Sequence, residues 1–220
     1  MTNITPTPIF DEFALDERCA RVLHRMNITT PTAVQAQAIP LVLQGKDIVA
    51  TAQTGTGKTL AFSLPALSRL AKHGKSKRNR MLVLAPTREL CIQVEQVIMD
   101  FCKALGMRSA PIYGGVGMHP QIAKLKKGCD IVVATPGRLL DHLSRGALDF
   151  KDLEILVFDE ADRMLDMGFM PDIQRILKQL PRKRQTLMFS ATFPPAIERL
   201  TRNMMHHPER VAVGMESKPV

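Results

Sequence analysis

The 220-residue chain contains no tryptophan and one tyrosine, and aromatic residues make up only 5% of it. So few rings argue against a stacking platform for single-stranded nucleic acid. No apolar run approaches the ~20 residues that a membrane-spanning helix requires. The first residues, MTNITPTPIFDEF, also lack the basic start and apolar stretch of a signal peptide. We therefore expect a cytoplasmic protein without membrane contact, which would hold any nucleic acid mainly by its backbone.

Cysteine is scarce and scattered. The four cysteines form no CxxC pair, which argues against a zinc site, and they are too few for a disulfide framework. Their simplest interpretation is as buried thiols in a reducing compartment. They are Cys19, Cys91, Cys102 and Cys129.

The chain has fewer acidic residues than basic residues. The chain has 30 Lys and Arg against 21 Asp and Glu, a formal net charge of +9. Such a balance favours polyanionic partners, because binding releases counterions from phosphates, although a basic surface can also serve solubility alone. The densest basic run, KHGKSKRNR from Lys72 to Arg80, is interpreted as a solvated loop that could contact nucleic acid.

Short apolar runs alternate with longer amphipathic stretches, which is typical of an α/β fold with a parallel sheet and helices on both faces. About seven strands are predicted, at 47–52, 81–85, 110–113, 131–134, 155–158, 186–190 and 210–213. Helices are predicted at 16–26, 32–43, 57–72, 87–105, 136–143, 171–180 and 195–205. We expect residues 1–45 to be a leader packed on the core, 46–213 to be the main domain and 214–220 to begin a linker.

The first strand runs into AQTGTGKT, residues 52–59, and then into an apolar helix. This order fits a phosphate-binding loop, except that Ala52 stands in place of the usual first glycine. Glycines let successive backbone N–H groups point at a phosphate chain, to which the helix adds its positive end. A chance Gly/Thr-rich turn is the alternative. The residues assigned to the nucleotide are Thr54, Gly55, Thr56, Gly57, Lys58, which reaches the outer phosphates, and Thr59, which ligates Mg²⁺.

Two acids follow the predicted strand 155–158. Asp159 and Glu160 lie at its carboxyl end, where open α/β sheets bind ligands. Asp159 is expected to hold Mg²⁺, and Glu160 to activate the attacking water. The alternative is that these acids only open a helix, whose N-terminus favours negative charge. Together with Lys58 they predict hydrolysis of a nucleoside triphosphate.

Several motifs then resemble one family, the DEAD-box RNA helicases, and the resemblance covers the chain from Phe10 to about Val213. The motifs are VFDEADRMLDMGF (157–169), AQTGTGKT, PTREL (86–90), GG (114–115), TPGR (135–138) and SAT (190–192), in the family's order. The resemblance implies an ATP-binding RecA-like domain of an ATP-dependent RNA helicase, which couples ATP turnover to local separation of RNA strands. The stretch MLDMGFMPDIQRIL (164–177) further resembles a bacterial RhlE-like branch.

The family also recognises adenine upstream, at a segment that NITTPTAVQ (27–35) resembles. Gln35 can pair with both N6 and N7 of adenine, which guanine does not permit. Phe10 corresponds to the family's upstream aromatic near the base. Ile28 stands where the family has an aromatic and could cover the base as an apolar face, or could belong to the core. Taken without the family, Gln35 would be a helix-surface residue.

Other motifs imply contact with an RNA strand through phosphates and 2′-hydroxyls, without reading of sequence. Small residues near helix starts let backbone N–H groups approach phosphates, and arginines add charge-assisted bonds. Arg88 could instead pair with Glu89 or Asp162. The RNA-binding set is Pro86, Thr87, Arg88, Gly114, Gly115, Thr135, Pro136, Gly137 and Arg138.

SAT has a different implied role, because in the family it couples the nucleotide state to strand separation. Ser190 and Thr192 are expected beside the DEAD strand, within reach of Asp162. Taken without the family, SAT is an ordinary helix N-cap.

Complete members carry a second RecA-like domain with an arginine-rich motif, and no HRxGRxxR-like run occurs in this sequence. The second domain is therefore an expected partner of an otherwise monomeric chain, which alone should be nearly inactive. A DNA-directed helicase and a non-enzymatic nucleotide-dependent module are the alternatives.

Overall fold

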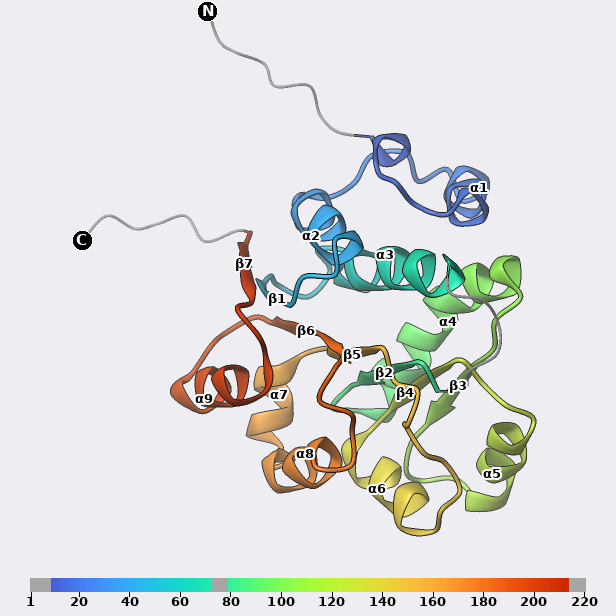
Figure 1. Ribbon diagram of the computed structural model, residues 1–220, viewed down its shortest axis with the longest axis vertical. Coiled ribbons are helices and arrows are strands. Elements are labelled where there is room, and N and C mark those ends of the chain that lie inside the picture. The colour runs from blue at the N-terminus through green and yellow to red at the C-terminus, as the bar shows by residue number, and fades with distance from the viewer. Residues whose placement is uncertain (1–8, 73–78, 214–220) are drawn as a thin grey trace, which may run out of the picture.

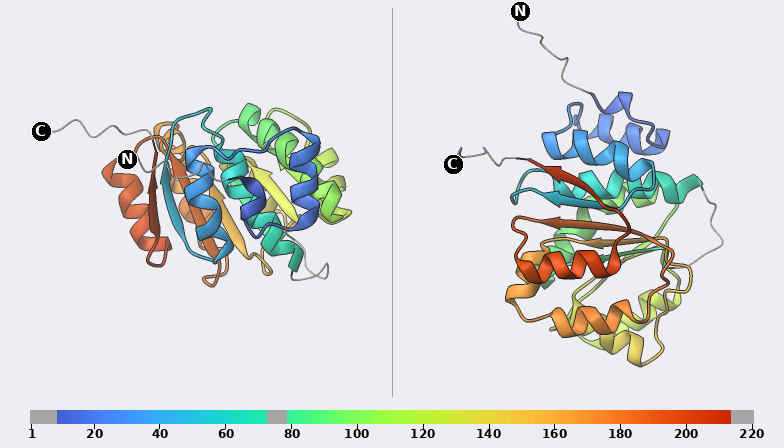
Figure 2. Two further views of the ribbon diagram at one scale, coloured as in Figure 1. Left: turned by 90° about the horizontal axis from the view of Figure 1, so that it is seen from above. Right: turned by 60° about the vertical axis from the view of Figure 1, so that its left-hand side comes forward.

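The computed structural model describes residues 9–72 and 79–213 (Figure 1). The predicted linker, 214–220, lies outside the described residues, and so do residues 73–78 of the basic run. The described residues fold around one sheet, with helices stacked above and below it (Figure 2). Among them, no helix is long and apolar enough to cross a membrane.

Seven short parallel strands form the sheet, in the order β3-β4-β2-β5-β6-β1-β7. β2, β4, β5 and β6 are buried along their whole length. Such burial is usual for parallel strands covered on both faces, and it explains the unbroken apolar sequences of β2, β4 and β5. The α/β prediction is confirmed, and every strand end lies within one residue of its expected place. The strands are β1 Ile48–Thr51, β2 Met81–Leu84, β3 Ser109–Ile112, β4 Ile131–Ala134, β5 Ile155–Phe158, β6 Gln185–Ser190 and β7 Glu209–Ala212.

Two helical layers bury the two faces of the sheet in separate apolar clusters. The first layer contains α1 Glu17–Arg25, α2 Ala33–Leu43, α3 Lys58–Lys72 and α4 Arg88–Leu105. The second contains α5 Met118–Lys126, α6 Pro136–Ser144, α7 Ala161–Asp166, α8 Met170–Leu177 and α9 Pro195–Met204. Figure 2 shows the first layer above the sheet and α8 and α9 below it in its right-hand view.

The leader lies on the first layer rather than apart from it. α2 packs along α3, and α1 packs against α4 (Figure 1). The Asp16 backbone N–H donates to the Ser68 hydroxyl at 3.0 Å, and the Asp16 carboxylate caps α1 by accepting from Arg18 N. These contacts bring the segment around Gln35 next to the start of α3.

Three elements were missed from the sequence. α5 buries only Gln121 and Leu125, so it has no apolar period to detect. α7 was considered only as the alternative explanation of the DEAD acids, and the turn of 3₁₀ helix Phe10–Glu12 is too short to predict. The solvated-loop interpretation is wrong at Arg80, whose fully buried guanidinium forms an ion pair with Glu154 at 2.8 Å.

Candidate active site

The chain reverses between β1 and α3, so that residues 52–57 curl around the amino end of the helix. Gly55 and Gly57 have φ of +86° and +87°, a left-handed conformation that glycine adopts without steric cost. A Cβ on Gly57 would also collide with the Gln35 side chain. Ala52 is buried, and its N–H donates to the Ser190 carbonyl at 3.1 Å. Ala52, which stands in place of the usual first glycine, therefore extends the pairing of β1 with β6 by one residue.

Two side chains of the leader donate hydrogen bonds to backbone carbonyls of this loop. The Thr32 hydroxyl donates to the Thr56 carbonyl at 2.7 Å, and the Gln35 amide donates to the Gly57 carbonyl at 3.0 Å. The Gln35 oxygen accepts from the Thr32 backbone N–H at 2.9 Å. With an exposed fraction of 3%, Gln35 is not a surface residue. The hydroxyl of Thr32 was not singled out from the sequence, although its place before a helix with glutamine three residues later is a capping signal.

Lys58 begins α3, Asp159 follows β5, and both are buried, with exposed fractions of 7% and 2%. Within residues 9–72 and 79–213, neither Lys58 Nζ nor Asp159 Oδ1 has a hydrogen-bond partner. Buried polar atoms in native proteins nearly always have one. Burial raises the pKa of the Asp159 carboxyl to about 6, although the Lys58 ammonium opposes the rise. The buried ammonium of Lys58 is suited to bind a phosphate group, and the buried carboxylate of Asp159 is suited to bind a cation.

The residues present suit Mg²⁺ bound together with a phosphate chain rather than a metal held by protein alone. The described part of the chain has no group of three His, Cys, Asp or Glu residues that could hold a metal. Magnesium usually keeps several waters and takes one or two carboxylates plus substrate phosphates. Asp159 and the half-buried Thr59 next to Lys58 supply oxygen donors of that kind.

Glu160 is held in a strained conformation at the edge of the loop. Its φ of 55° lies in the left-handed region, which costs a non-glycine residue on the order of 1–3 kcal/mol. Its carboxylate accepts from the Thr54 hydroxyl at 3.3 Å and pairs with Arg163 at 3.2 Å. Thr54 thus connects the loop 52–57 with Glu160, and Arg163 is a partner that was not expected.

Asp162 joins the start of α7 to the end of β6. Its carboxylate accepts from both the backbone N–H and the hydroxyl of Thr192 at 2.9 Å, and its own N–H donates to the Ser190 hydroxyl at 3.0 Å. Burial opposes the charge of Asp162, but the hydrogen bonds with Ser190 and Thr192 outweigh it and lower the pKa. The structure therefore brings together the three residues expected to lie within reach of one another.

The residues expected to contact adenine are buried or half-buried. Phe10 has an exposed fraction of 3% and packs edge-on against Phe13, with ring centroids 6.1 Å apart. Its N–H donates to the Thr29 carbonyl at 3.1 Å, and Ile28 is half-buried against the same core cluster. A hollow of about 150 Å³ lies between Phe10, Ile28 and His24. The predicted contact of Phe10 and Ile28 with a base stays a prediction.

The two arginines of the predicted RNA set differ in their surroundings. Arg88 is exposed, and its guanidinium lies 5.1 Å from the centre of the Tyr113 ring, close to Gly115. It forms no ion pair with Glu89 or Asp162 among the described residues, contrary to the alternative considered above. Stacking on a ring holds a guanidinium without using its N–H donors.

Arg138 instead forms hydrogen bonds to neighbouring residues. Its guanidinium donates to the Val116 carbonyl at 2.9 Å and to Gln121 at 3.4 Å, and it lies 3.9 Å from Asp141. The Gln121 amide oxygen also accepts from Nε2 of the buried His142 ring at 2.9 Å. These contacts brace the loop that carries Gly114 and Gly115. The remaining members of the set lie at the starts of two helices: Pro86 and Thr87 at α4, and Thr135, Pro136 and Gly137 at α6.

Asp159→Asn is expected to stabilise the fold at neutral pH when metal and nucleotide are absent. The carboxyl binds its proton more tightly in the folded chain, at a pKa of about 6, than in the unfolded chain at 3.8. The stability associated with this group is therefore present below the unfolded pKa and lost as the pH rises through 6. Two pKa units correspond to about 3 kcal/mol as an upper limit. Urea unfolding in EDTA near pH 7.5 and near pH 4.5 measures the gain, which should be larger at the higher pH.

Asp162→Asn is the matched control for that measurement. The pKa of Asp162 is lowered, so its charged form stabilises the fold above its unfolded pKa. Asparagine there should destabilise the protein under the conditions in which asparagine at Asp159 stabilises it. A loss of stability from both substitutions would show that Asp159 is satisfied by contacts within the chain.

Comparison with known proteins agrees with this geometry. The family model described as DEAD/DEAH box helicase matches residues 32–200. The chain is 47% identical over 204 residues to the ATP-dependent RNA helicase CshA of Listeria monocytogenes, which covers 93% of this chain and 39% of that protein. It is 46% identical over 205 residues to the ATP-dependent RNA helicase DeaD of Escherichia coli, covering 93% and 32%. The chain therefore spans about a third to two fifths of these relatives. Since they are CshA and DeaD proteins, the expected RhlE-like branch is not supported.

Solved structures also resemble the fold. A DEAD box protein from Methanococcus jannaschii matches with a TM-score of 0.87 and 36% identity, over 95% of this chain and 57% of that one. A hypothetical ATP-dependent RNA helicase from Sulfolobus tokodaii matches with a TM-score of 0.83 and 39% identity, over 90% and 57%.

Proposed function

Because the chain belongs to the DEAD/DEAH box helicase family, we propose that it is the ATP-binding domain of an ATP-dependent RNA helicase. The relatives described above carry that name. In this proposal residues 1–45 are a leader with the adenine-recognition segment, and 46–213 are the RecA-like domain. Residues 214–220 begin the connection to a second RecA-like domain. ATP binding and hydrolysis between the two domains would drive local separation of RNA strands.

The pair of unsatisfied buried atoms, Lys58 Nζ and Asp159 Oδ1, carries this proposal. A polyphosphate supplies acceptors for the ammonium, and Mg²⁺ supplies positive charge for the carboxylate. Backbone N–H groups of residues 54–57 would bind the phosphates, while Thr59 and Asp159 would hold the metal through oxygen. When bound, the metal offsets negative charge on the phosphates.

Glu160 is the proposed acceptor of the proton from the attacking water. Its carboxylate lies at the edge of the phosphate loop, where the Thr54 hydroxyl and Arg163 orient it. A base must be held within hydrogen-bond reach of the proton that it removes. Glu160 combines a left-handed backbone with contacts both to the loop, at Thr54, and to α7, at Arg163. Strained residues of this kind cluster at active sites.

The RNA strand is proposed to bind at the loops after β2, β3 and β4. Arg88 is the better candidate for a direct phosphate contact, because its guanidinium is exposed and stacked on Tyr113. Arg138 would act mainly by holding the glycine loop in place, since its guanidinium is already hydrogen-bonded to Val116. Asp162, Ser190 and Thr192 would transmit the nucleotide state, because they link the DEAD segment to the end of β6.

The preference of the chain for adenine over guanine nucleotides tests the proposed nucleotide site directly. The full 220-residue chain is expected to bind Mg-ADP more tightly than Mg-GDP by titration calorimetry. Gln35→Ala should reduce this preference by ~1–3 kcal/mol, because it removes the bidentate amide that would read N6 and N7. It should also weaken both nucleotides, because the same amide holds the Gly57 carbonyl.

Thr32→Val separates these two effects. It removes the hydroxyl that holds the Thr56 carbonyl but leaves the Gln35 amide in place. Both nucleotides should then bind more weakly by the same factor, with the preference for adenine kept. An undiminished preference in Gln35→Ala would refute the adenine role, and an absence of ADP binding by the unaltered chain would refute the proposed function.

A further inference from the structure

A groove lies across the β3 edge of the sheet, where the two helical layers separate. α4 forms one wall and α5 the other, and Figure 1 shows both helices beside β3. The hollow measures about 390 Å³, within the range of ligand pockets. It lies at the amino ends of β3 and β4, opposite the carboxyl ends that carry the candidate active site. Its lining includes Glu95, Met99, Cys102, Met107, Arg108 and Lys127.

The wall of the groove is apolar and rich in sulfur. Met99 and Met107 flank it, with the thiols of Cys102 and Cys129 beneath them. Burial raises the pKa of Cys102 to about 12, so its sulfur stays a neutral, apolar group. Methionine side chains are flexible and polarizable, and they recur on surfaces that accept varied apolar partners. The groove therefore suits an apolar side chain.

The rim of the groove is basic, and its buried acid is already neutralised. Glu95 accepts from the Ser109 hydroxyl at 2.8 Å and lies 3.6 Å from the Lys124 ammonium. Arg108 and Lys127 are exposed, and their side chains form no ion pair within the described part of the chain. These two cations project at the mouth of an apolar hollow. Their charge favours a ligand that combines carboxylates with an apolar anchor.

The exposed edge of β3 does not accept an added strand. The carbonyls of Arg108 and Ile112 bond to the β4 side, so the backbone of Ser109 and Pro111 faces outward. Pro111 lacks an N–H to donate, and proline on an edge strand blocks further pairing. An occupant must therefore insert side chains into the groove. An amphipathic helix does this with one face.

We propose that this groove binds an acidic amphipathic helix of a partner protein, with one apolar side chain inserted between Met99 and Met107. The carboxylates of the helix pair with Arg108 and Lys127. RNA fits less well, because the wall is apolar and has no aromatic side chain on which a base could stack. The interaction lies outside the proposed helicase site and does not depend on it.

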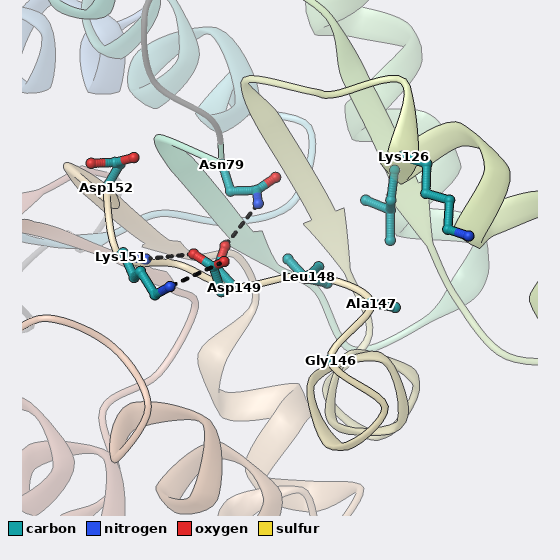
Figure 3. A pocket seen from close by; sticks show the side chains of 9 residues that line it. Asn79, Lys126, Gly146, Ala147, Leu148, Asp149, Lys151 and Asp152 are labelled. Atoms are coloured by element: carbon teal, nitrogen blue, oxygen red, sulfur yellow. Dashed lines mark hydrogen bonds and ion pairs between the residues drawn. The ribbon is translucent and has the colours of Figure 1, made fainter.

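A neighbouring hollow shows what distinguishes this groove. The hollow between Asn79 and the loop 146–152 is polar, and Asp149 within it already interacts with two neighbouring residues (Figure 3). There Lys151 lies 3.9 Å from the Asp149 carboxylate, and Asn79 donates to the Asp149 carbonyl at 2.7 Å. No comparable partners occupy the cations at the mouth of the α4–α5 groove among the described residues.

Selection of random 16-residue peptides displayed on phage, against the immobilised full chain, tests the chemistry of the partner. The variant Met99→Glu serves for counter-selection, since Met99 is only half-buried and glutamate can be solvated there. The enriched peptides should carry several Asp or Glu residues around a Leu, Ile, Phe or Trp at helical spacing. Enriched peptides that are neutral or basic would overturn the proposal.

Fluorescence anisotropy of the most enriched peptide then locates the site. Its affinity should fall at least tenfold for Met99→Glu and for the double variant Arg108→Glu/Lys127→Glu. It should be unchanged for Lys178→Glu, an exposed charge reversal at the C-cap of α8, which does not line the groove. Thermal melts must first show that the variants are folded. An equal loss in all three variants, or none, would overturn the groove as the site. Loss of oligouridylate binding in the double variant without loss of peptide binding would identify an RNA surface instead.

Discussion

The 220-residue chain is expected to bind ATP but to release phosphate at a low rate that single-stranded RNA does not raise. Hydrolysis requires the charge that develops on the γ-phosphate to be met from more than one side. In the proposed site Lys58, Thr59 and Asp159 all act from this domain. An arginine finger supplied by another element is worth ~10³–10⁵-fold in rate in comparable NTPases, and no HRxGRxxR-like run occurs in this sequence. Steady-state phosphate release with and without oligouridylate measures the effect.

The same residues within a chain that also carries a second RecA-like domain should turn over ATP in an RNA-dependent manner. Glu160→Gln in that longer chain should abolish turnover and leave ATP binding intact, because glutamine keeps the shape and the contact with Thr54 but accepts no proton. Single-stranded DNA in place of RNA should stimulate poorly. Robust RNA-stimulated turnover by the 220-residue chain alone would contradict the requirement for a second domain, while stimulation by DNA would favour the DNA-directed alternative.

Lys58→Ala is expected to weaken Mg-ATP binding by at least tenfold. The ammonium of Lys58 is buried at the start of α3 and lacks an acceptor within the described residues, so its role is not to bond another part of the chain. Charge-assisted hydrogen bonds contribute ~1.5–3 kcal/mol. Titration calorimetry with Mg-ATP and Mg-ADP measures the loss, which should be larger for ATP because lysine reaches the outer phosphates.

Lys72→Ala provides the matched control for this experiment. Lys72 lies at the other end of α3 and is exposed, so its removal changes the net charge equally without altering the site. A thermal melt should find both variants folded. Unchanged affinity in Lys58→Ala would refute the phosphate-loop assignment, whereas equal weakening in both variants would point to a non-specific charge effect.

Local order in the sequence was enough to predict the sheet and the glycine-rich loop that leads into α3. Runs such as Met81–Leu84 and Ile155–Phe158 are apolar throughout, and a parallel strand covered on both faces requires such a run. The loop 52–59 is equally local, because its glycines and the helix that follows are set by neighbouring residues. α5 could not be found in this way, since only two of its nine residues are buried and the contacts that hold it come from elsewhere.

Only the tertiary structure determined which side chains form hydrogen bonds or ion pairs with distant residues. In the sequence Arg80 belongs to a basic run that predicts a solvated loop. In the structure it forms an ion pair with Glu154, 74 residues away. Arg88 and Arg138 occur in similar motifs, but only Arg138 is hydrogen-bonded to Val116 and Gln121, while Arg88 stacks on Tyr113. The hydrogen bonds from Gln35 to Gly57 and from Thr54 to Glu160 likewise join residues that are distant in sequence. Periodicity and propensity act over a few residues, and they determine where a strand, helix or turn forms. The partner of a charge depends on which elements folding brings side by side, and no local pattern encodes that.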